Sequence, residues 1–124
     1  MHDTLVPVRM TVDMDAILAY AEITGDFNPI HVDPEFAART PLGGVIAHGT
    51  MSSNLVLQSI ASTLGRDAMR GCVLDVRFAR PVRVGDRLEA GGALVQAPCG
   101  FEVWVRNQDG ETVIDGTATL AAGT

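Results

Sequence analysis

The sequence predicts an α+β domain in which one long helix lies against one face of a curved antiparallel sheet. Three observations support this fold class. The first half of the chain has apolar residues at helical spacing, including one long apolar segment. The second half alternates apolar and polar residues with a period of two. The length of 124 residues suits one domain, so residues 1–124 are assigned to a single unit.

A strand and a helix are predicted first. Residues 5–11, LVPVRMT, are typical of a strand, and Pro7 places it at a sheet edge because proline cannot donate a ladder hydrogen bond. Asp13 is a typical helix N-cap, and Gly25 is a typical helix end. Apolar residues between them repeat at i, i+3, i+4 and i+7, namely Met14, Ile17, Leu18 and Ala21.

Residues 25–32 are predicted to form a loop. Asn28 precedes Pro29 and is therefore disfavoured in the α region, while Pro29 has no N–H to donate. Asp33 then caps a short helix over residues 34–39, whose first residue is a proline.

The longest candidate helix lies within residues 46–64. Its start is expected near Gly49 or Thr50, and Gly65 ends it. Its apolar side chains cover most of the helix surface, which is typical of a buried helix. They are Met51, Leu55, Val56, Leu57, Ile60, Ala61 and Leu64, with the clearest face along Leu57, Ile60, Ala61 and Leu64.

The rest of the chain is predicted to form an antiparallel meander of four strands. Alternating patterns mark residues 72–79, 87–96, 101–106 and 112–120. The segments PVRVGD, APCG and NQDG between them are typical of turns.

Charge and hydropathy exclude several classes of partner. The net charge of −6 argues against nucleic acid or an anionic membrane. No apolar run approaches the roughly 20 residues that cross a bilayer, and the first residues lack a signal-peptide layout. A cytoplasmic protein is therefore expected. Cys72 and Cys99 have no C-x-x-C spacing and are expected to be reduced and buried.

Arginine supplies all nine cations, and four of them fall between residues 77 and 87. This strip comprises Arg77, Arg80, Arg83 and Arg87. It can contact a phosphorylated ligand, or it can be a solvated strand edge, and the sequence leaves both interpretations open.

Two histidines and several carboxylates gather in TGDFNPIHVDPEF, residues 24–36, and GGVIAHGT, residues 43–50. A metal site built from Asp26, His31, Asp33 and His48 is disfavoured because the spacing matches no established ligand signature. An acid–base pair needs only Asp26 and His31, which can share one water molecule. The alternative is that Asp26 caps local N–H groups and His31 is a hydrogen-bonded loop residue.

The predicted helix start adds a second feature. The N–H groups of Gly49 and Thr50 would lack intrahelical partners and lie at the positive end of the helix dipole. Such donors suit a developing oxyanion, for instance a thioester carbonyl that becomes an enolate. A glycine at position 49 would allow that carbonyl to approach the backbone closely. The alternative is that this glycine only allows the backbone to change from loop to helix.

These residues resemble a known family. The pattern G-D-x-N-P-I-H-x-D at residues 25–33, followed by I-A-H-G at 46–49, resembles the MaoC-type dehydratases. These are the (R)-specific enoyl-CoA hydratases of the hotdog fold. The segment FARPVRVGD, residues 78–86, is similar to their strand–turn segment, and the resemblance extends in order over nearly the whole chain.

The resemblance implies a role for individual residues. Asp26 and His31 match the catalytic pair, which activates the water that adds at C3 of a trans-2-enoyl thioester and supplies a proton to C2. The implied reaction is a reversible syn hydration to the (R)-3-hydroxyacyl thioester. Asn28 matches an amide that orients the water or the His31 ring, and Gly49 matches the backbone donor to the thioester oxygen.

Two further positions follow from the same comparison. His48 matches a position with a structural role. Asn54 stands where some bacterial members carry a serine near the active site, so it is a candidate substrate contact. Ser52 and Ser53 are close in sequence but do not match that position.

The resemblance also implies the partners. The family uses no metal and no redox cofactor, and coenzyme A or an acyl carrier protein holds the substrate. Hotdog subunits pair their sheets, so a homodimer or larger homo-oligomer is expected. Two alternatives stay open, namely an acyl-CoA thioesterase of the same fold and a catalytic subunit of a heteromeric dehydratase. A binding module without activity is disfavoured because Asp26 and His31 are both present.

Overall fold

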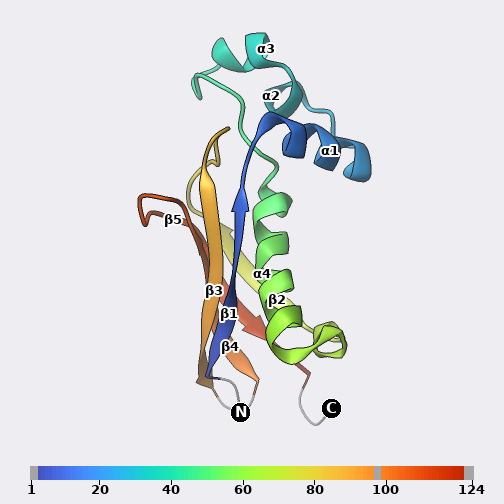
Figure 1. Ribbon diagram of the computed structural model, residues 1–124, viewed down its shortest axis with the longest axis vertical. Coiled ribbons are helices and arrows are strands. Elements are labelled where there is room, and N and C mark those ends of the chain that lie inside the picture. Colours follow the sequence, from blue (N-terminus) through green and yellow to red (C-terminus); the bar gives the residue numbers. More distant parts are fainter. Residues whose placement is uncertain (1–2, 97–98, 122–124) are drawn as a thin grey trace.

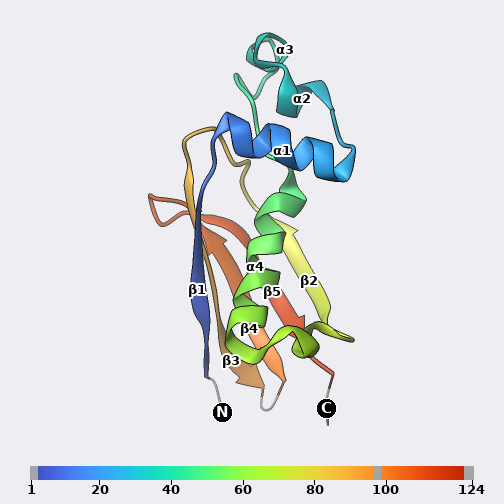
Figure 2. The same cartoon turned by 45° about the vertical axis from the view of Figure 1, so that its right-hand side comes forward.

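The computed structural model describes residues 3–96 and 99–121. The helices are α1 (Met14–Thr24), α2 (Pro29–Val32), α3 (Pro34–Ala38), α4 (Gly49–Leu64) and the 3-10 helix η1 (Arg66–Met69). The strands are β1 (Thr4–Thr11), β2 (Val73–Phe78), β3 (Arg87–Gln96), β4 (Gly100–Arg106) and β5 (Thr112–Thr119). These elements form two layers, in which α4 lies along one face of a single sheet (Figures 1 and 2). The predicted α+β arrangement is therefore confirmed.

The sheet has the strand order β1-β3-β4-β5-β2, and every neighbouring pair is antiparallel. The predicted four-stranded meander is wrong in one respect, because β2 pairs with β5 and not with β3. The connection between β2 and β3 is therefore not a hairpin turn. It forms hydrogen bonds with the segment that precedes α4. Ala47 donates its N–H to the carbonyl of Val82 at 2.8 Å, and Ile46 forms a β-bridge with Arg83.

Side-chain caps begin α1 and α3, and glycines follow α1 and α4, as predicted. Asp13 Oδ1 accepts from the Ala16 N–H at 2.8 Å, and Gly25 ends α1 with a φ of 73°. Asp33 Oδ1 accepts from two amides at the start of α3. Helix α4 begins at Gly49 and is followed by Gly65, as expected from the sequence.

The loop predicted for residues 25–32 is only partly correct. Residues Pro29–Val32 form the single turn α2. Asn28 caps this turn, because its Oδ1 accepts from the Ile30 N–H at 3.2 Å. Pro29 fits the first helical turn, where its missing N–H has no intrahelical partner to lose. The short helix η1 was not predicted, and part of the APCG turn lies outside the described residues.

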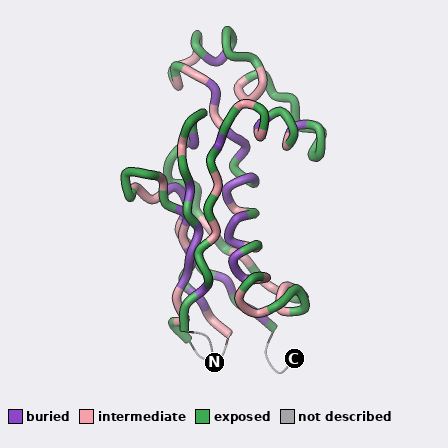
Figure 3. The backbone as a smooth tube through the Cα atoms, viewed as in Figure 1, coloured by how far each residue is buried: buried purple, intermediate pink, exposed green. Residues whose placement is uncertain are grey.

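The core lies between α4 and the sheet (Figure 3). Strand residues such as Leu88, Val103 and Ile114 are buried against it. The buried face of α4 comprises Met51, Ser52, Leu55, Val56, Ser59 and Ile60. The predicted face is therefore rotated, since Leu57 and Ala61 are only partly buried. The true buried face includes two serines, which a search for apolar spacing does not find.

The two cysteines are free, as expected, but each is partly exposed, so the prediction of buried thiols is corrected. Burial is still sufficient to raise the pKa of the Cys72 thiol above its usual value. Among the helices of residues 3–96 and 99–121, none has the length and apolar character needed to cross a membrane. The cytoplasmic location stays a prediction.

Candidate active site

The site lies near the N-terminal end of α4, where α1 passes close to that end and α2 lies beyond it (Figure 2). Two hydrogen bonds hold the segment from Asp26 to His31 against the chain that leads into α4. The Nδ1 atom of His31 lies 2.7 Å from the carbonyl oxygen of Ile46. The Nε2 atom of His48 lies 2.9 Å from the carbonyl oxygen of Asp26. Both anchors use backbone carbonyls, so they position the segment and leave the Asp26 carboxylate available.

Asp26 and His31 are brought together as the motif predicted. A carbonyl can only accept, so His31 Nδ1 carries the proton and a neutral ring presents a lone pair at Nε2. Nε2 lies 4.0 Å from Asp26 Oδ2. This distance is too long for a direct hydrogen bond, and one water molecule can bond to both atoms. The His31 side chain is 12% exposed and the Asp26 side chain is 51% exposed, so the pair is reachable from solvent.

The second oxygen of Asp26 has the local role that the alternative interpretation expected. Asp26 Oδ1 accepts from the Asn28 N–H at 3.2 Å. The capping interpretation and the acid–base interpretation are thus compatible, because each uses a different carboxylate oxygen.

His48 packs beneath the pair and is only 3% exposed. Its ring stacks on His31 with centroids 4.0 Å apart, and Tyr20 contacts it at 5.0 Å. The Tyr20 hydroxyl donates to Thr50 Oγ1 at 2.7 Å. Sequence reasoning did not find Tyr20, although it is the only tyrosine in the chain. Its contacts tie the last part of α1 to the first turn of α4.

A cavity of about 260 Å³ opens beside His31 and Gly49. Its walls are mostly apolar and come from the segment before α4, the end of β2 and the connection that follows β2. A β-carbon at Gly49 would lie 3.1 Å from the Phe78 ring, so the position favours glycine. The first amide of α4 with an acceptor is that of Met51, which donates to the His48 carbonyl. The amides of Gly49 and Thr50 therefore have no intrahelical acceptor.

The two asparagines of the motif have different environments. Asn28 caps α2 through its side-chain oxygen, so its observed contacts shape the loop. Asn54 is exposed on α4 and is not among the residues that line the cavity. Ser52 lines the cavity instead, although the sequence comparison did not select it. Contacts of Asn28 and Asn54 with a substrate stay predictions.

Asp26, His31 and His48 each offer one ligand atom, and these atoms all lie within 4.8 Å of one another. Asp33, the fourth member of the disfavoured metal site, caps α3 instead. Two of the four imidazole nitrogens already contact backbone carbonyls. The remaining carboxylate and imidazole atoms could bind either a cation or a water molecule. The expected absence of a metal therefore stays a prediction.

Three arginines of the strip between residues 77 and 87 have partners within the protein. Arg77 pairs with Asp115 at 3.1 Å and Arg80 with Glu111 at 3.2 Å. Arg83 donates to the Leu42 carbonyl at 2.7 Å. These contacts favour the interpretation of the arginines as part of a solvated strand edge over a role in phosphate binding.

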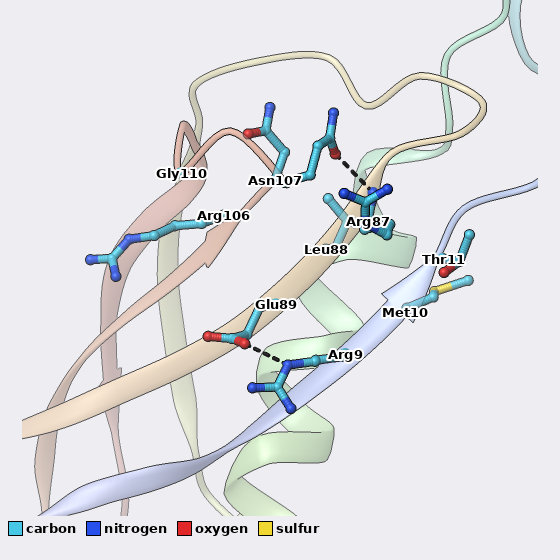
Figure 4. A pocket seen from close by; sticks show the side chains of 10 residues that line it. Arg9, Met10, Thr11, Arg87, Leu88, Glu89, Arg106, Asn107 and Gly110 are labelled. Carbon is cyan, nitrogen blue, oxygen red and sulfur yellow. Dashed lines mark hydrogen bonds and ion pairs between the residues drawn. The ribbon is translucent and has the colours of Figure 1, made fainter.

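A larger depression, of about 560 Å³, lies on the outer face of β1, β3 and β4 (Figure 4). Arg9 and Glu89 form an ion pair across it at 2.6 Å, and Arg87 lines its upper part. Arg106 lies over the Trp104 ring at 4.6 Å. None of its lining residues belongs to the Asp26–His31 pair. The smaller cavity is therefore the better candidate for chemistry.

One long helix packed on a five-stranded antiparallel sheet is the arrangement of the hotdog fold, and Asp26 and His31 lie close to the start of that helix. The family comparison is more specific. A family model described as "MaoC like domain" matches residues 2–123. The chain belongs to this family, which confirms the resemblance found from the motifs.

Curated relatives carry dehydratase names. The 3-hydroxybutyryl-CoA dehydratase of Methylorubrum extorquens is 37% identical over 82 residues, which is 66% of this chain and 52% of the relative. The 3-hydroxyacyl-thioester dehydratase Z of Mycobacterium tuberculosis is 40% identical over 90 residues, which is 69% of this chain and 60% of the relative. The chain thus spans little more than half the length of these relatives.

Solved structures support the fold over the whole chain. R-hydratase PhaJ1 from Pseudomonas aeruginosa has a TM-score of 0.83 at 29% identity, covering 97% of this chain and 80% of that chain. An (R)-hydratase from A. caviae has a TM-score of 0.80 at 23% identity, covering 97% and 96% of the two chains. The second likeness shows the hotdog fold alone.

Proposed function

We propose that this protein hydrates trans-2-enoyl thioesters to (R)-3-hydroxyacyl thioesters and catalyses the reverse dehydration. The observation that carries the proposal is the 4.0 Å distance between His31 Nε2 and Asp26 Oδ2, together with a cavity at the start of α4 that is lined by His31 but not by Asp26. Membership of the MaoC-like family and the dehydratase names of relatives support it.

The proposed hydration step uses one water molecule between the two side chains. One member of the pair takes a proton from the water, and the water oxygen bonds to C3. The electron pair of the C2–C3 double bond moves toward the thioester, which gains enolate character. The other member of the pair, which must start the cycle protonated, gives its proton to C2. Transfer of a proton from the first member to the second then restores the pair, so the sum is the addition of one water. Addition is syn because both groups act from the same side.

The Gly49 N–H is the proposed donor to the thioester oxygen. Charge builds on that oxygen in the transition state, and a preorganised backbone donor stabilises it there. The Phe78 ring would lie 3.1 Å from a β-carbon at position 49, so a glycine fits this position best. No metal or redox cofactor takes part in this scheme.

The size of the cavity favours a short acyl chain. Its volume of about 260 Å³ is below the 300–1,000 Å³ typical of sites for drug-sized ligands. Coenzyme A or the pantetheine arm of an acyl carrier protein would remain outside, attached through the thioester sulfur.

A panel of enoyl-CoA substrates of increasing length tests the proposal. We expect hydration to be fastest for the short members, to give the (R)-alcohol on chiral analysis, and to be unchanged by EDTA. An (S)-product, or no hydration at any length, would contradict the proposal. Release of free CoA from a saturated acyl-CoA would instead support the thioesterase alternative.

We also propose a homodimer formed through β2. This strand lies at a sheet edge, and Val73 and Phe78 on it are 63% and 54% exposed. The opposite edge, β1, contains Pro7 and an irregular register, both of which discourage strand pairing. A homodimeric mass together with activity is the expected result on sedimentation. A monomer that gains activity only with a second subunit would support the heteromeric alternative.

A further inference from the structure

Ser52 is a buried polar side chain without a partner. The residue is 1% exposed, and its Oγ forms no hydrogen bond to any residue in the ranges 3–96 and 99–121. Leaving such a hydroxyl unsatisfied is destabilising, because it has lost its bonds to water. Buried polar groups of native proteins are nearly always bonded, so this atom calls for a specific explanation.

Other hydroxyls of the same helix do have acceptors. Ser53 Oγ donates to the Thr50 carbonyl at 3.1 Å, and Thr63 Oγ1 donates to the Ser59 carbonyl at 2.7 Å. Ser59, which is equally buried, donates to the Val6 carbonyl at 2.5 Å. Helical serines on α4 thus find backbone acceptors readily, and Ser52 differs from them because it faces a cavity.

Among the residues that the structure describes, Ser52 is the only one with a hydroxyl group that lines the cavity beside His31. It follows Gly49 by three positions, so the two residues lie on the same side of α4. Side chains in a helix lean toward its N-terminus, which brings Oγ toward the Gly49 amide. A single oxygen bound in the cavity can therefore accept from both groups.

We propose that Ser52 Oγ donates a second hydrogen bond to the thioester oxygen of the bound substrate, beside the Gly49 N–H. This inference rests on the proposed function. It assigns to Ser52 a substrate contact that the sequence comparison placed at Asn54. The substrate oxygen satisfies the hydroxyl, and the bond strengthens as that oxygen gains negative charge.

Ser52→Ala is the first test, with Ser59→Ala as its matched control. Removal of an unpartnered hydroxyl is expected to leave the melting temperature unchanged or slightly higher. The same change is expected to lower kcat for hydration by about 100-fold, as for other oxyanion donors. Ser59→Ala removes a satisfied hydrogen bond, so it is expected to lower the melting temperature by a few degrees and to leave kcat unchanged.

A binding cycle separates this role from a structural one. Dissociation constants are measured for butyryl-CoA and for S-butyl-CoA, a thioether without the carbonyl oxygen, with wild type and with Ser52→Ala. Wild type is expected to prefer the thioester, and Ser52→Ala is expected to lose about tenfold of that preference.

Three results of the binding cycle would contradict the inference about Ser52. An unchanged preference in Ser52→Ala, in a protein that still hydrates enoyl-CoA, would overturn the Ser52 inference and leave the proposed function intact. A loss of melting temperature with unchanged preference would indicate a buried water that bonds to Ser52 and to the unpartnered Nδ1 of His48. No binding of butyryl-CoA to wild type would overturn the inference together with the proposed substrate class.

Discussion

Asp26→Asn is expected to lower kcat for hydration of a short enoyl-CoA by at least about three orders of magnitude. Asparagine keeps the size of the side chain and can still accept from the Asn28 N–H through its amide oxygen. It loses the ability to take or to give a proton at the atom that faces His31. Stability should be little changed, because the Asp26 side chain is 51% exposed. Steady-state kinetics and thermal melting measure the two effects.

His31→Ala is the companion measurement. It should reduce kcat to a similar extent, and the double variant should be no slower than the slower single variant, because both side chains act on one water. Some stability is also expected to be lost, since the ring contacts the Ile46 carbonyl and stacks on His48. Either single variant with hydration close to that of wild type would contradict the assignment of this pair.

Gly116→Ala is expected to cause the largest loss of stability. Gly116 lies on β5 between Val103 of β4 and Val76 of β2. A β-carbon there would overlap the Asp75 carbonyl oxygen and lie 2.7 Å from Val76 Cα. These are backbone atoms, so β2 as a whole must move. We expect a loss of about 3 kcal/mol in the free energy of unfolding, or roughly 10 °C in melting temperature.

The matched control is Gly44→Ala. A β-carbon at Gly44 would meet only the Arg83 side chain, at 3.8 Å, and its φ does not favour glycine. Its melting temperature should stay within a few degrees of wild type. Equal melting temperatures for the Gly116 and Gly44 variants would show that β2 can shift away from β5 without cost.

Local chemistry explains which parts of the fold could be predicted. The bounds of α1 and α4 follow from caps and glycines, which act within a few residues of the helix end. The position of β2 could not be predicted in this way. Alternation identifies a strand but not its neighbour, and the partner of β2 is β5, which is distant in the sequence.

The site shows the same division. Asp26 and His31 could be found because they lie only five positions apart in one short segment. Ser52 and Tyr20 could not, since their importance depends on which face of α4 is buried and on what α1 contacts. The apolar pattern predicted that Leu57 and Ala61 lie on the buried face of α4. It did not predict a serine on that face.

The anchors of the acid–base segment have an evolutionary consequence. Both end on main-chain carbonyls, those of Ile46 and Asp26, which every amino acid possesses. Outward-facing neighbours such as Phe27, which is 55% exposed, can therefore drift without altering the spacing of the pair.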